Sequence, residues 1–579
     1  MIALSQLNQL PPDRFAAALA GIFEHSPWIV ERAALLGPFA STLQLLQTLR
    51  AVIERAATDE QLALICAHPD LAGKAAIRNQ LTAESAREQR GAGLSDCTPQ
   101  QFARLHQLNA EYRARFGFPF ILAVRGHTPD SIIAAFERRM AHSPEVERNT
   151  ALEQIGLIGG FRLADAVSND AGAEVMAMLH ELGRYSEHAE GLTCSYLSAT
   201  HAATAARIRE WMLAAGASVH TDAVGNVVGR WLCGRADAKT LMTGSHYDTV
   251  LNAGKYDGRL GIVLPMVVAW QLRQRGVVLP FDLEILGFSD EEGVRFKTTF
   301  IGSSAVAGQF DTRILDHTDA DGISMRAALQ RAGFDPAEIP SIARDPQGLL
   351  GYVEIHIEQG PVLLDAGQAL GVVTGIAGSV RYLVNITGLA GHAGTVPMGL
   401  RRDAAAAAAE VILAVERRCA ANPGVVGTVG QLNVPGGAIN VIPGQCELSI
   451  DLRAADDVTR DAALADVLAE IERIGARRGV SIQLDKVMQA AAAPCSPRMQ
   501  ARWSRSIARA TGNQQPRQLP SGAGHDAMKM AAIADIGMLF VRCGNGGISH
   551  HPDESLELPD AALAAAAFED FLLSFQDEP

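Results

Sequence analysis

The chain has 579 residues, which is more than one hydrophobic core supports and predicts two to four domains. Its 48% hydrophobic and 20% charged content is typical of a globular protein and excludes a disordered or collagen-like chain. The formal net charge of -14 argues against a nucleic-acid partner, because phosphate binding needs clustered lysine and arginine.

Three further features concern the cellular compartment. The eight cysteines include no C-x-x-C pair, which fits reduced thiols better than a disulfide framework. The first residues, MIALSQLNQLPPDRF, lack a basic segment followed by an apolar run. No stretch of about 20 apolar residues is present to span a bilayer. We therefore expect a cytoplasmic protein without a membrane partner.

Residues 1–166 have a helical pattern almost throughout. Phe15, Leu19 and Phe23 recur at the spacing of one helix face, and alternating strand-like runs are absent. This pattern predicts a separate all-α domain of ordinary size. The polar and small-residue segment DAVSNDAGA at 165–173 is the expected linker to the next domain.

From about residue 174 the pattern changes to strands that alternate with helices. Apolar runs at 241–244 and 283–288 end in polar clusters, and a helical run at 261–273 lies between them. This order predicts βαβ units and a largely parallel sheet. Ligands of such sheets gather at the carboxyl ends of the strands.

A second pattern interrupts this α/β region. Strand-like runs occur at 381–388 and 446–453, and helical runs occur at 403–417 and 462–476. We therefore expect a multidomain protein with an all-α domain at 1–166, an α/β domain at 174–379 and 490–579, and an inserted α+β domain at 380–489.

Histidine and carboxylate side chains gather at the predicted strand ends of the α/β domain. His246, Asp248 and Asp257 follow the first apolar run among glycines, and the adjacent Glu291 and Glu292 follow the second. Asp248 can orient the His246 ring, and Asp257 can bridge two metal ions with its two oxygens. Because the side chains of adjacent glutamates diverge, one can bind a metal while the other faces a water molecule.

Two more histidines can complete a pair of metal sites. His356 lies in EIHIEQGP and His550 in GISHHPDE. Two divalent cations close together lower the pKa of a shared water and polarise a carbonyl group. Neutral imidazoles and carboxylates suit Zn²⁺ and also Mn²⁺, so the sequence predicts two such ions without deciding between them.

The motifs GSHYDTV, AGKYDG, SDEEGVRF, HIEQGP, GHAGTVPM and SHHPDE occur in this order. Together they resemble the di-metal amidohydrolases related to aminoacylases and carboxypeptidase-type peptidases. Within this group they are similar to the ureido-cleaving branch, which includes allantoate amidohydrolase, N-carbamoyl-L-amino acid hydrolase and β-ureidopropionase. The resemblance covers residues 175–575. It implies one metal bound by His246, Asp257 and His356, a second bound by Asp257, Glu292 and His550, and catalytic roles for Glu291 and Asp248.

The same resemblance implies the substrate contacts. These are Gln359, His392, Asn440, Arg453 and His525. Arg453 suits a substrate carboxylate, because its planar guanidinium can hold two oxygens at once. The family also implies a homodimer formed by the inserted domain, in which His392, Asn440 and Arg453 reach towards the partner's metal site.

Two adjacent histidines stand where the family pattern has one. We assign the metal-binding position to His550, because Glu554 then follows four residues later, as in the family pattern. His551 is expected to lie beside the site without binding metal.

The helical region carries a second resemblance. EHSPWIVERA, AHPDLAGK, LTAESAREQRGAGL and NAEYRARFGFPFILAVRG resemble the decarboxylase of 2-oxo-4-hydroxy-4-carboxy-5-ureidoimidazoline (OHCU), over about residues 1–163. That family is all-α, dimeric and free of cofactor, so the resemblance implies no cofactor for this domain. It implies His68 and Glu88 as catalytic residues. Loss of CO₂ leaves electron density on a ring carbon, and a His poised near neutral pH can deliver a proton to it. The implied substrate-binding residues are Pro69, Ser85, Gln89, Phe120, Ile121, Leu122, Ala123, Val124 and Arg162.

The two resemblances constrain each other. The decarboxylase forms (S)-allantoin, and hydrolysis of allantoin gives allantoate, whose ureido groups the second domain would attack. We therefore predict a bifunctional enzyme of urate degradation that acts on small-molecule ureides and releases ureidoglycine, ammonia and CO₂ from allantoate.

Three alternatives stay open at this point. The second domain can instead be an N-carbamoyl-L-amino acid hydrolase or a β-ureidopropionase. The first domain can be an inactive tether or a dimerisation module. A ureide sensor without turnover is the third alternative, and the presence of Glu291 with a full ligand set argues against it.

Overall fold

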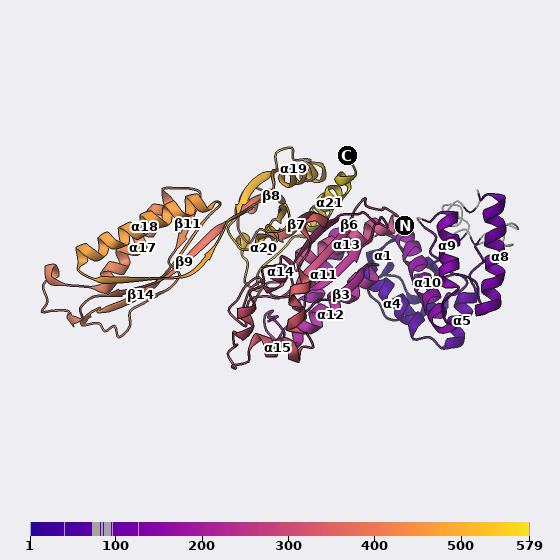
Figure 1. Ribbon diagram of the computed structural model, residues 1–579, viewed down its shortest axis with the longest axis horizontal. Helices are drawn as coiled ribbons and strands as arrows, with labels where there is room; N and C mark the ends of the chain where they lie inside the picture. The colour runs from indigo at the N-terminus through magenta and orange to yellow at the C-terminus, as the bar shows by residue number, and fades with distance from the viewer. Residues whose placement is uncertain are drawn as a thin grey trace.

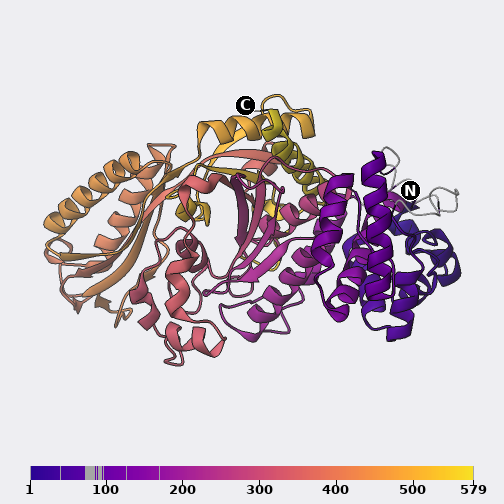
Figure 2. The same ribbon diagram turned by 45° about the vertical axis from the view of Figure 1, so that its right-hand side comes forward.

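The computed structural model describes residues 2–39, 41–71, 82, 85, 88, 94, 97–125, 127–168 and 170–577. Three parts follow one another along an elongated molecule (Figure 1). A helical region occupies one end, a large α/β region lies in the middle, and a smaller α+β lobe projects at the other end. Figure 2 shows the same succession after a 45° turn.

The helical region matches the predicted helical pattern. Its described helices are α1 (Leu4–Leu7), α2 (Pro12–Ala18), α3 (Trp28–Ala34), α4 (Thr42–Glu54), α5 (Thr58–Cys66), α8 (Pro99–Phe116), α9 (Pro129–Arg139) and α10 (Pro144–Ala166). Thr98, Thr128 and Ser143 cap α8, α9 and α10 through their hydroxyl groups, and each helix begins with proline. One feature differs from an all-α domain: β1 (Ile2–Ala3) pairs with β2 (Val167–Ser168), which joins the start of the chain to the end of α10.

The α/β region is built on a sheet with the order β16-β8-β18-β7-β5-β6-β4-β3, and β17 pairs with β8. The strands are β3 (Ser218–Thr221), β4 (Val227–Trp231), β5 (Thr240–His246), β6 (Asp282–Phe288), β7 (Leu349–Ile357), β8 (Leu370–Ile376), β16 (Ala493–Pro494), β17 (Arg517–Ser521) and β18 (Ile536–Val541). The central strands β6, β5, β7 and β18 are parallel, as predicted, whereas β4 and β8 are antiparallel to β6 and β18.

Helices cover this sheet and complete its core. They include α11 (Ala171–Leu182), α12 (Ala199–Ala214), α13 (Leu260–Gln274), α14 (Ile301–Val306), α15 (Met325–Arg331), α19 (Pro497–Thr511), α20 (Ala527–Met530) and α21 (Leu558–Leu573). The α13 helix follows the predicted helical run and packs on β5, β6 and β7. It is buried over almost its whole length, which explains why its sequence is apolar on every side.

The parallel strands bring distant polar residues to one edge. The seven residues of β5 are buried and end at His246, and β6 ends at Phe288, two residues before Asp290. His356 is the penultimate residue of β7, which pairs with β5 in parallel. The carboxyl ends of these strands therefore present their histidine and carboxylate residues towards the same space.

The small lobe is an α+β unit that the chain enters after β8 and leaves before β16. Its sheet has the order β11-β14-β9-β15, formed by β9 (Gly378–Thr387), β11 (Val425–Thr428), β14 (Gln445–Ala454) and β15 (Ser481–Ala490), with β12 (Leu432–Asn433) beside β14. The helices α17 (Ala404–Ala420) and α18 (Asp457–Arg478) pack on one face through a core of alternating strand residues. The predicted strands and helices of this segment are all present.

The helical region packs directly on the α/β region, and one buried apolar cluster runs through both. Two arginines of the helical region donate to the last carbonyl groups of α/β helices: Arg50 to Ala214 at the end of α12, and Arg125 to Gln274 at the end of α13. Both contacts satisfy carbonyls that a helix end leaves without partners. Among the described helices, none combines the length and apolar character needed to cross a membrane.

Candidate active sites

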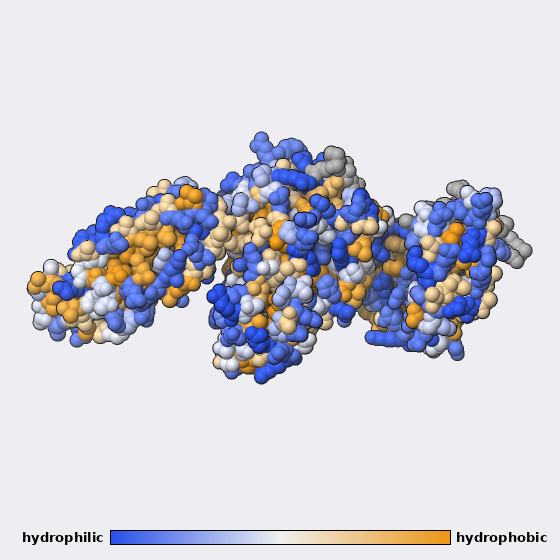
Figure 3. All heavy atoms as spheres, viewed as in Figure 1, coloured by the Kyte–Doolittle hydropathy of each residue, from blue (hydrophilic) through white to orange (hydrophobic). Residues whose placement is uncertain are grey.

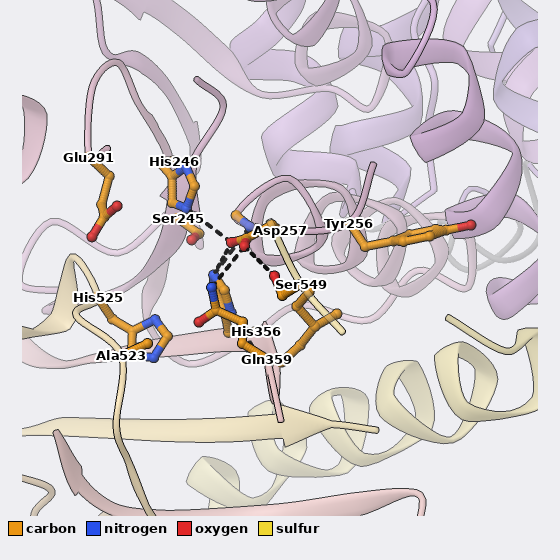
Figure 4. A network of polar contacts seen from close by, with 12 residues as sticks. Ser245, His246, Tyr256, Asp257, Glu291, His356, Gln359, Ala523, His525 and Ser549 are labelled. Atoms are coloured by element: carbon orange, nitrogen blue, oxygen red, sulfur yellow. Dashed lines mark hydrogen bonds and ion pairs between the residues drawn. The ribbon is translucent and has the colours of Figure 1, made fainter. Parts of the chain in front are cut away.

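Asp257 is the centre of a polar cluster at the carboxyl edge of the large sheet (Figure 4). Its Oδ1 lies 3.5 Å from Nε2 of His246 and 3.2 Å from Nε2 of His356. Its Oδ2 lies 3.3 Å from Nε2 of His550, which is 3.4 Å from Oε1 of Glu292. Two groups of ligand atoms, His246–Asp257–His356 and Asp257–Glu292–His550, therefore share one carboxylate.

The protonation of the histidines tests whether this cluster suits a metal. Nδ1 of His246 contacts the carbonyl of Asp248 at 3.1 Å, and Nδ1 of His356 contacts the carbonyl of Ile357 at 2.8 Å. A carbonyl only accepts, so each Nδ1 carries a proton, and in the neutral ring that binds a metal the Nε2 that faces the carboxylate of Asp257 carries none. Lone pairs then face lone pairs, and Oδ1 of Asp257 is buried without a hydrogen-bond donor. The donor set fits a pair of divalent cations.

The electrostatics of the cluster agree with this fit. The carboxylates of Asp257 and Glu292 raise the pKa of His550 to about 10. Burial opposes charge on His246, yet without bound cations the carboxylates of Asp248 and Asp257 raise its pKa well above the ordinary value. The protein thus concentrates negative charge that attracts a cation to this position.

Asp248 lies behind the ligands and holds two elements at once. Its Oδ1 is 3.4 Å from Nδ1 of His246 and accepts a hydrogen bond from the backbone N–H of Glu291 at 3.0 Å. Its Oδ2 accepts from the backbone N–H of Glu292 at 3.2 Å. Sequence reasoning assigned it to His246 alone, whereas the fold also makes it the anchor of the segment that follows β6.

Glu291 faces the cluster from the side of His246 (Figure 4). One carboxylate oxygen of Glu291, one of Glu292 and a ring nitrogen of His246 lie within 4.8 Å of one another. Glu291 is buried, and burial together with the negative charge of Glu292 raises its pKa well above the ordinary value of a glutamate. A carboxylate with a raised pKa is a stronger base, which suits the role of accepting a proton from water.

Three residues outside the sequence-derived set surround the cluster, and two of them contact Asp257. The hydroxyl oxygen of Ser549 lies 2.8 Å from Oδ2 of Asp257 and 2.9 Å from Glu554, so its single hydrogen joins the two carboxylates. Glu554 accepts the backbone N–H groups of Tyr256 and Asp257 at 2.9 and 3.1 Å. Glu354, buried below the site, accepts the hydroxyl of Ser245 and contributes to a further group with His356 and His525. In the sequence, only Glu554 was indicated beforehand, by its position four residues after His550.

The glycine of the loop explains how Glu554 comes so close. A Cβ atom on Gly254 would lie 2.2 Å from the carboxyl carbon of Glu554. No side chain fits there, so glycine is required for this approach. Gln359, which has a φ of 56°, donates from Nε2 to Oδ2 of Asp257 at 2.8 Å and so also borders the site.

The two adjacent histidines differ in position. His550 belongs to the group with Asp257 and Glu292, whereas Nδ1 of the exposed His551 lies 3.7 Å from Asp553. The structure therefore places His551 outside the described groups of potential metal ligands.

The remaining expected substrate residues fall into two places. His525 is buried beside the cluster, with its ring 4.5 Å from that of His356 and its Nε2 2.7 Å from the hydroxyl of Ser521. His392 and Asn440 are exposed on the short β10 (Gly391–His392) and next to β13 (Val441–Ile442), at the far end of the small lobe.

Arg453 departs from the arrangement that the resemblance implied. It lies at the opposite end of the small sheet from His392, because β14 pairs its last residues with the first residues of β9. Its Nη1 donates to the carbonyl of Gly522 in the α/β region of the same chain at 2.6 Å. Within one chain, Arg453 therefore adjoins its own large sheet, whereas His392 and Asn440 do not.

A second candidate site lies in the helical region. A cavity of about 30 Å³ is lined by His68, Pro69, Leu71, Ser85, Glu88, Phe120, Ile121, Leu122, Val124, Ile158 and Arg162. Ala123 lies in the same strip but turns its N–H to Gln154. Gln89 lies outside the described residues. Residues from four separate parts of the sequence thus meet around one cavity.

His68 presents a bare nitrogen to this cavity. Its Nδ1 contacts the carbonyl of Leu64 at 2.9 Å and therefore carries the proton, whereas its buried Nε2 has no partner among the described residues. Burial lowers the pKa of His68 below the ordinary value of histidine. The neutral ring is thus ready to accept a proton before it can deliver one.

Arg162 holds the acidic side of the cavity. All five of its N–H groups donate hydrogen bonds. Nε and Nη2 each donate to Glu88 at 2.9 Å, and Nη2 also donates to Ser85 at 3.1 Å. Nη1 donates to Glu24 at 3.0 Å and to the carbonyl of Gly21 at 3.3 Å. In this arrangement Arg162 positions Glu88 and Ser85, and its expected contact with the substrate stays a prediction. Sequence reasoning missed Glu24, a buried carboxylate whose motif, EHSPWIVERA, was the only signal.

Comparison with known proteins agrees with both sites. The family model for peptidase family M20/M25/M40 matches residues 242–574. The chain belongs to peptidase family M20/M25/M40. The OHCU decarboxylase model matches residues 8–164, so the helical region is an OHCU decarboxylase domain. Hydrolases of the M20 family typically depend on two metals, in agreement with the two groups of ligands around Asp257.

Relatives within the M20 family carry different names. An allantoate deiminase of Arabidopsis thaliana is 40% identical and covers 69% of this chain and 82% of its own length. An N-carbamoyl-L-amino acid amidohydrolase of Geobacillus stearothermophilus is 39% identical and covers 68% of this chain and 96% of its own. The crystal structure of an amidase of the hydantoinase/carbamoylase family from Burkholderia multivorans has a TM-score of 0.65 at 31% identity, covering 70% of this chain and 98% of that one.

Proposed function

We propose that the chain is a bifunctional enzyme of ureide breakdown. Its helical domain would decarboxylate OHCU to (S)-allantoin, and its M20 domain would hydrolyse allantoate to ureidoglycine, ammonia and CO₂. The observation that carries this proposal is the presence of an OHCU decarboxylase domain and an M20 domain in one chain. An M20 relative named allantoate deiminase supports the same choice of substrate.

In the hydrolytic reaction, Glu291 is the general base. It takes a proton from the attacking water, and the water oxygen bonds to the ureido carbonyl carbon. Glu291 then passes the proton to the terminal nitrogen as the carbon–nitrogen bond breaks and ammonia leaves. The remaining carbamate loses CO₂ and gives ureidoglycine. Asp248 keeps Glu291 in place through its backbone N–H.

The cluster around Asp257 would hold the metal ions for this reaction. The proposed ligands are His246, Asp257 and His356 for one ion and Asp257, Glu292 and His550 for the other. When bound, two ions such as Zn²⁺ or Mn²⁺ supply Lewis acidity that acidifies water and polarises the ureido carbonyl. Ser549, Gln359 and Glu554 keep Asp257 between the two sets of ligands.

In the decarboxylation, His68 carries the proton. The unprotonated Nε2 accepts it from the hydroxyl group of the substrate. As CO₂ leaves, the electron pair of the broken carbon–carbon bond moves to the adjacent ring carbon, which carries the ureido group. The imidazolium protonates that carbon, and the former hydroxyl becomes the carbonyl of allantoin. Glu88 orients the substrate beside His68, and Arg162 keeps Glu88 in position. The apolar strip from Phe120 to Val124 covers the cavity and excludes water.

We propose a homodimer formed through the small lobe. Hydrophobic residues are exposed over α17 in the view of Figure 3, and Leu413 of this helix is 49% exposed. Met398, Leu400 and Ile439 are also exposed at the end of the lobe that carries His392 and Asn440. In this dimer, His392 and Asn440 would reach the partner's metal site, whereas Arg453 serves its own chain.

Ammonia release from allantoate, measured on the protein supplied with Mn²⁺ or Zn²⁺, tests the hydrolytic half. The alternative is an N-carbamoyl-L-amino acid hydrolase, which the Geobacillus stearothermophilus relative favours. Parallel kinetics with allantoate and N-carbamoyl amino acids decide between them, and a clear preference for the carbamoyl compounds would refute the allantoate assignment. Spectroscopic assay of OHCU disappearance tests the decarboxylase half.

A further inference from the structure

A cleft of about 770 Å³ lies between the open face of the small sheet and the segment that leads to His525. Its walls include Ser449 and Val426 of the small lobe and Pro520 and Gly522 of the α/β region. The cleft is large enough for a small organic ligand. Ser521 of the cleft wall lies 2.7 Å from Nε2 of His525, whose ring packs against that of His356 in the metal cluster.

Three charged side chains stand in a row on the sheet side of this cleft. Arg381 and Asp451 are directly opposite each other on β9 and β14, and Arg453 follows Asp451 by two residues, so all three lie on the same face. Arg453 donates from Nε and Nη2 to the two oxygens of Asp451 at 3.0 Å each. Arg381 donates from Nε to Oδ2 of Asp451 at 2.8 Å.

The row carries a net positive charge in a chain of net charge -14. Among the described residues that line the cleft, these are the charged ones, and two guanidinium groups face one carboxylate. The charges balance when a ligand adds one more carboxylate. An aqueous cleft with excess positive charge attracts anions, so the row favours an anionic ligand.

The hydrogen bonds leave open donors for such a ligand. Arg381 uses only Nε, and its two terminal nitrogens donate to no group of the described chain. Nη1 of Arg453 is occupied by the carbonyl of Gly522, a neutral acceptor that a carboxylate can displace. Asp451 holds both guanidinium groups, and the nitrogens that do not contact it are the two terminal nitrogens of Arg381 and Nη1 of Arg453.

We propose that Arg381 is a second carboxylate-binding residue of the M20 active site, which acts together with Arg453 while Asp451 positions both. This inference rests on the proposed function and names the part of the ureide that the cleft recognises. The carboxylate of the substrate takes the terminal nitrogens of Arg381 and replaces the Gly522 carbonyl at Arg453. Substrate binding therefore exchanges a contact between the small lobe and the α/β region for contacts with the ligand.

Binding calorimetry on the metal-loaded protein tests this role. The background is Glu291→Gln, in which turnover does not disturb the measurement. Allantoate is compared with methylenediurea, an uncharged diureide in which hydrogen replaces the carboxylate. Arg381→Ala is expected to weaken allantoate binding about tenfold, because a charge-assisted pair is lost from a partly exposed site. Methylenediurea binding should stay unchanged.

Two further variants separate recognition from folding. Arg381→Lys keeps the charge without the planar fork, so it should recover part of the allantoate affinity. Arg418→Ala removes an arginine that pairs with Asp466 on the helical side of the same lobe and should leave both ligands unaffected. Equal losses for the two ligands in Arg381→Ala, or no loss for allantoate, would overturn the proposal.

The proposed function is judged separately by the hydrolytic activity of the wild-type protein. If that protein prefers N-carbamoyl-L-amino acids, the calorimetry uses N-carbamoylglycine in place of allantoate and its amide in place of methylenediurea. Arg381→Ala is then still expected to weaken binding of the acid and not of the amide. A protein that binds neither allantoate nor N-carbamoylglycine overturns the carboxylate site together with the proposed function.

Discussion

Glu554 accepts a hydrogen bond at 3.1 Å from the backbone N–H of Asp257, although 297 residues of sequence separate the two. Ser549 joins their carboxylates from the same segment. The loop that carries Asp257 is thus held by Ser549 and Glu554, which lie near the C-terminal end of the sequence. The metal cluster consequently depends on completion of the whole α/β fold, including the segment after β18.

Replacement of Glu291 by Gln is expected to reduce amidohydrolase kcat by about 10²- to 10⁴-fold, because the variant cannot accept the proton of water. The metal content should stay the same, since Glu291 is not among the proposed ligands. OHCU decarboxylation should be unaffected. Steady-state kinetics for both reactions and elemental analysis check these three points, and wild-type hydrolysis by the variant would remove Glu291 from its role.

Removal of divalent ions should separate the two activities. Dialysis against a chelator is expected to abolish ureide hydrolysis, because the ligand groups around Asp257 lose the cations that their facing lone pairs require. Decarboxylation should continue. Re-addition of Zn²⁺ or Mn²⁺ should restore hydrolysis, and hydrolysis that survives complete metal removal would contradict the two-metal site.

The pH dependence of decarboxylation should reflect the environment of His68. Burial lowers its pKa, so the neutral ring persists below pH 6.5, the ordinary value for histidine. Activity should therefore hold as the pH drops below 6.5 and decline only as it passes through the lowered pKa. An acidic limb of the pH–rate profile above 6.5 would contradict a neutral His68, and His68→Asn should remove decarboxylation at every pH.

The lowered pKa of His68 also affects folding stability. The unfolded chain binds a proton at His68 more readily than the folded chain, so the free energy of unfolding falls as the pH decreases below 6.5. The His68→Asn variant should lack this contribution. Urea unfolding of both proteins over the range from pH 7 to pH 5 measures the difference.

Glu24 is expected to be a positioning residue for decarboxylation. Glu24→Gln removes one charge from the buried pair with Arg162 and so loosens the arginine that holds Glu88. We expect kcat to fall about tenfold, in line with the loss of one hydrogen bond to a charged group, with little change in KM.

Glu60→Gln is the matched control for Glu24. Glu60 pairs with Arg32 on the surface of the same domain, where solvent and salt screen the ion pair and it contributes little to stability. This variant should retain full activity. Equal losses in the two variants would mean that the effect of Glu24 is one of general stability.

Subunit mixing tests the proposed dimer. His392→Ala and Glu291→Gln proteins are each expected to be poorly active in hydrolysis. In a mixed dimer, the His392→Ala chain keeps its own Glu291 and receives His392 from the partner. Equal mixing should therefore restore about a quarter of the wild-type sites. Activity that stays at the level of the separate variants would show that His392 does not act across an interface.

Local sequence determined most of the secondary structure. The apolar runs of β5 and β6, the buried helix α13 and the strands and helices of the small lobe occur where hydrophobic periodicity placed them, because burial sets that periodicity. The tiny β1–β2 pair was not foreseeable, since two-residue strands carry no periodic signal.

The sequence alone also identified the types of chemistry. His246, Asp257, Glu291, Glu292, His356 and His550 were singled out from their motifs, and the histidine and carboxylate side chains indicated metal binding before any geometry was known. Family motifs made this possible, because short strings around catalytic residues retain the pattern of the site.

Only the tertiary structure decided how these groups are held and shared. It made Asp248 the anchor of both His246 and the Glu291 backbone, engaged every N–H of Arg162 with protein groups, and placed Arg453 beside Gly522 of its own chain. It also revealed Glu24, Ser549 and Glu554. Such contacts join residues that are far apart in sequence, and no local pattern encodes the direction in which a side chain meets a partner hundreds of residues away.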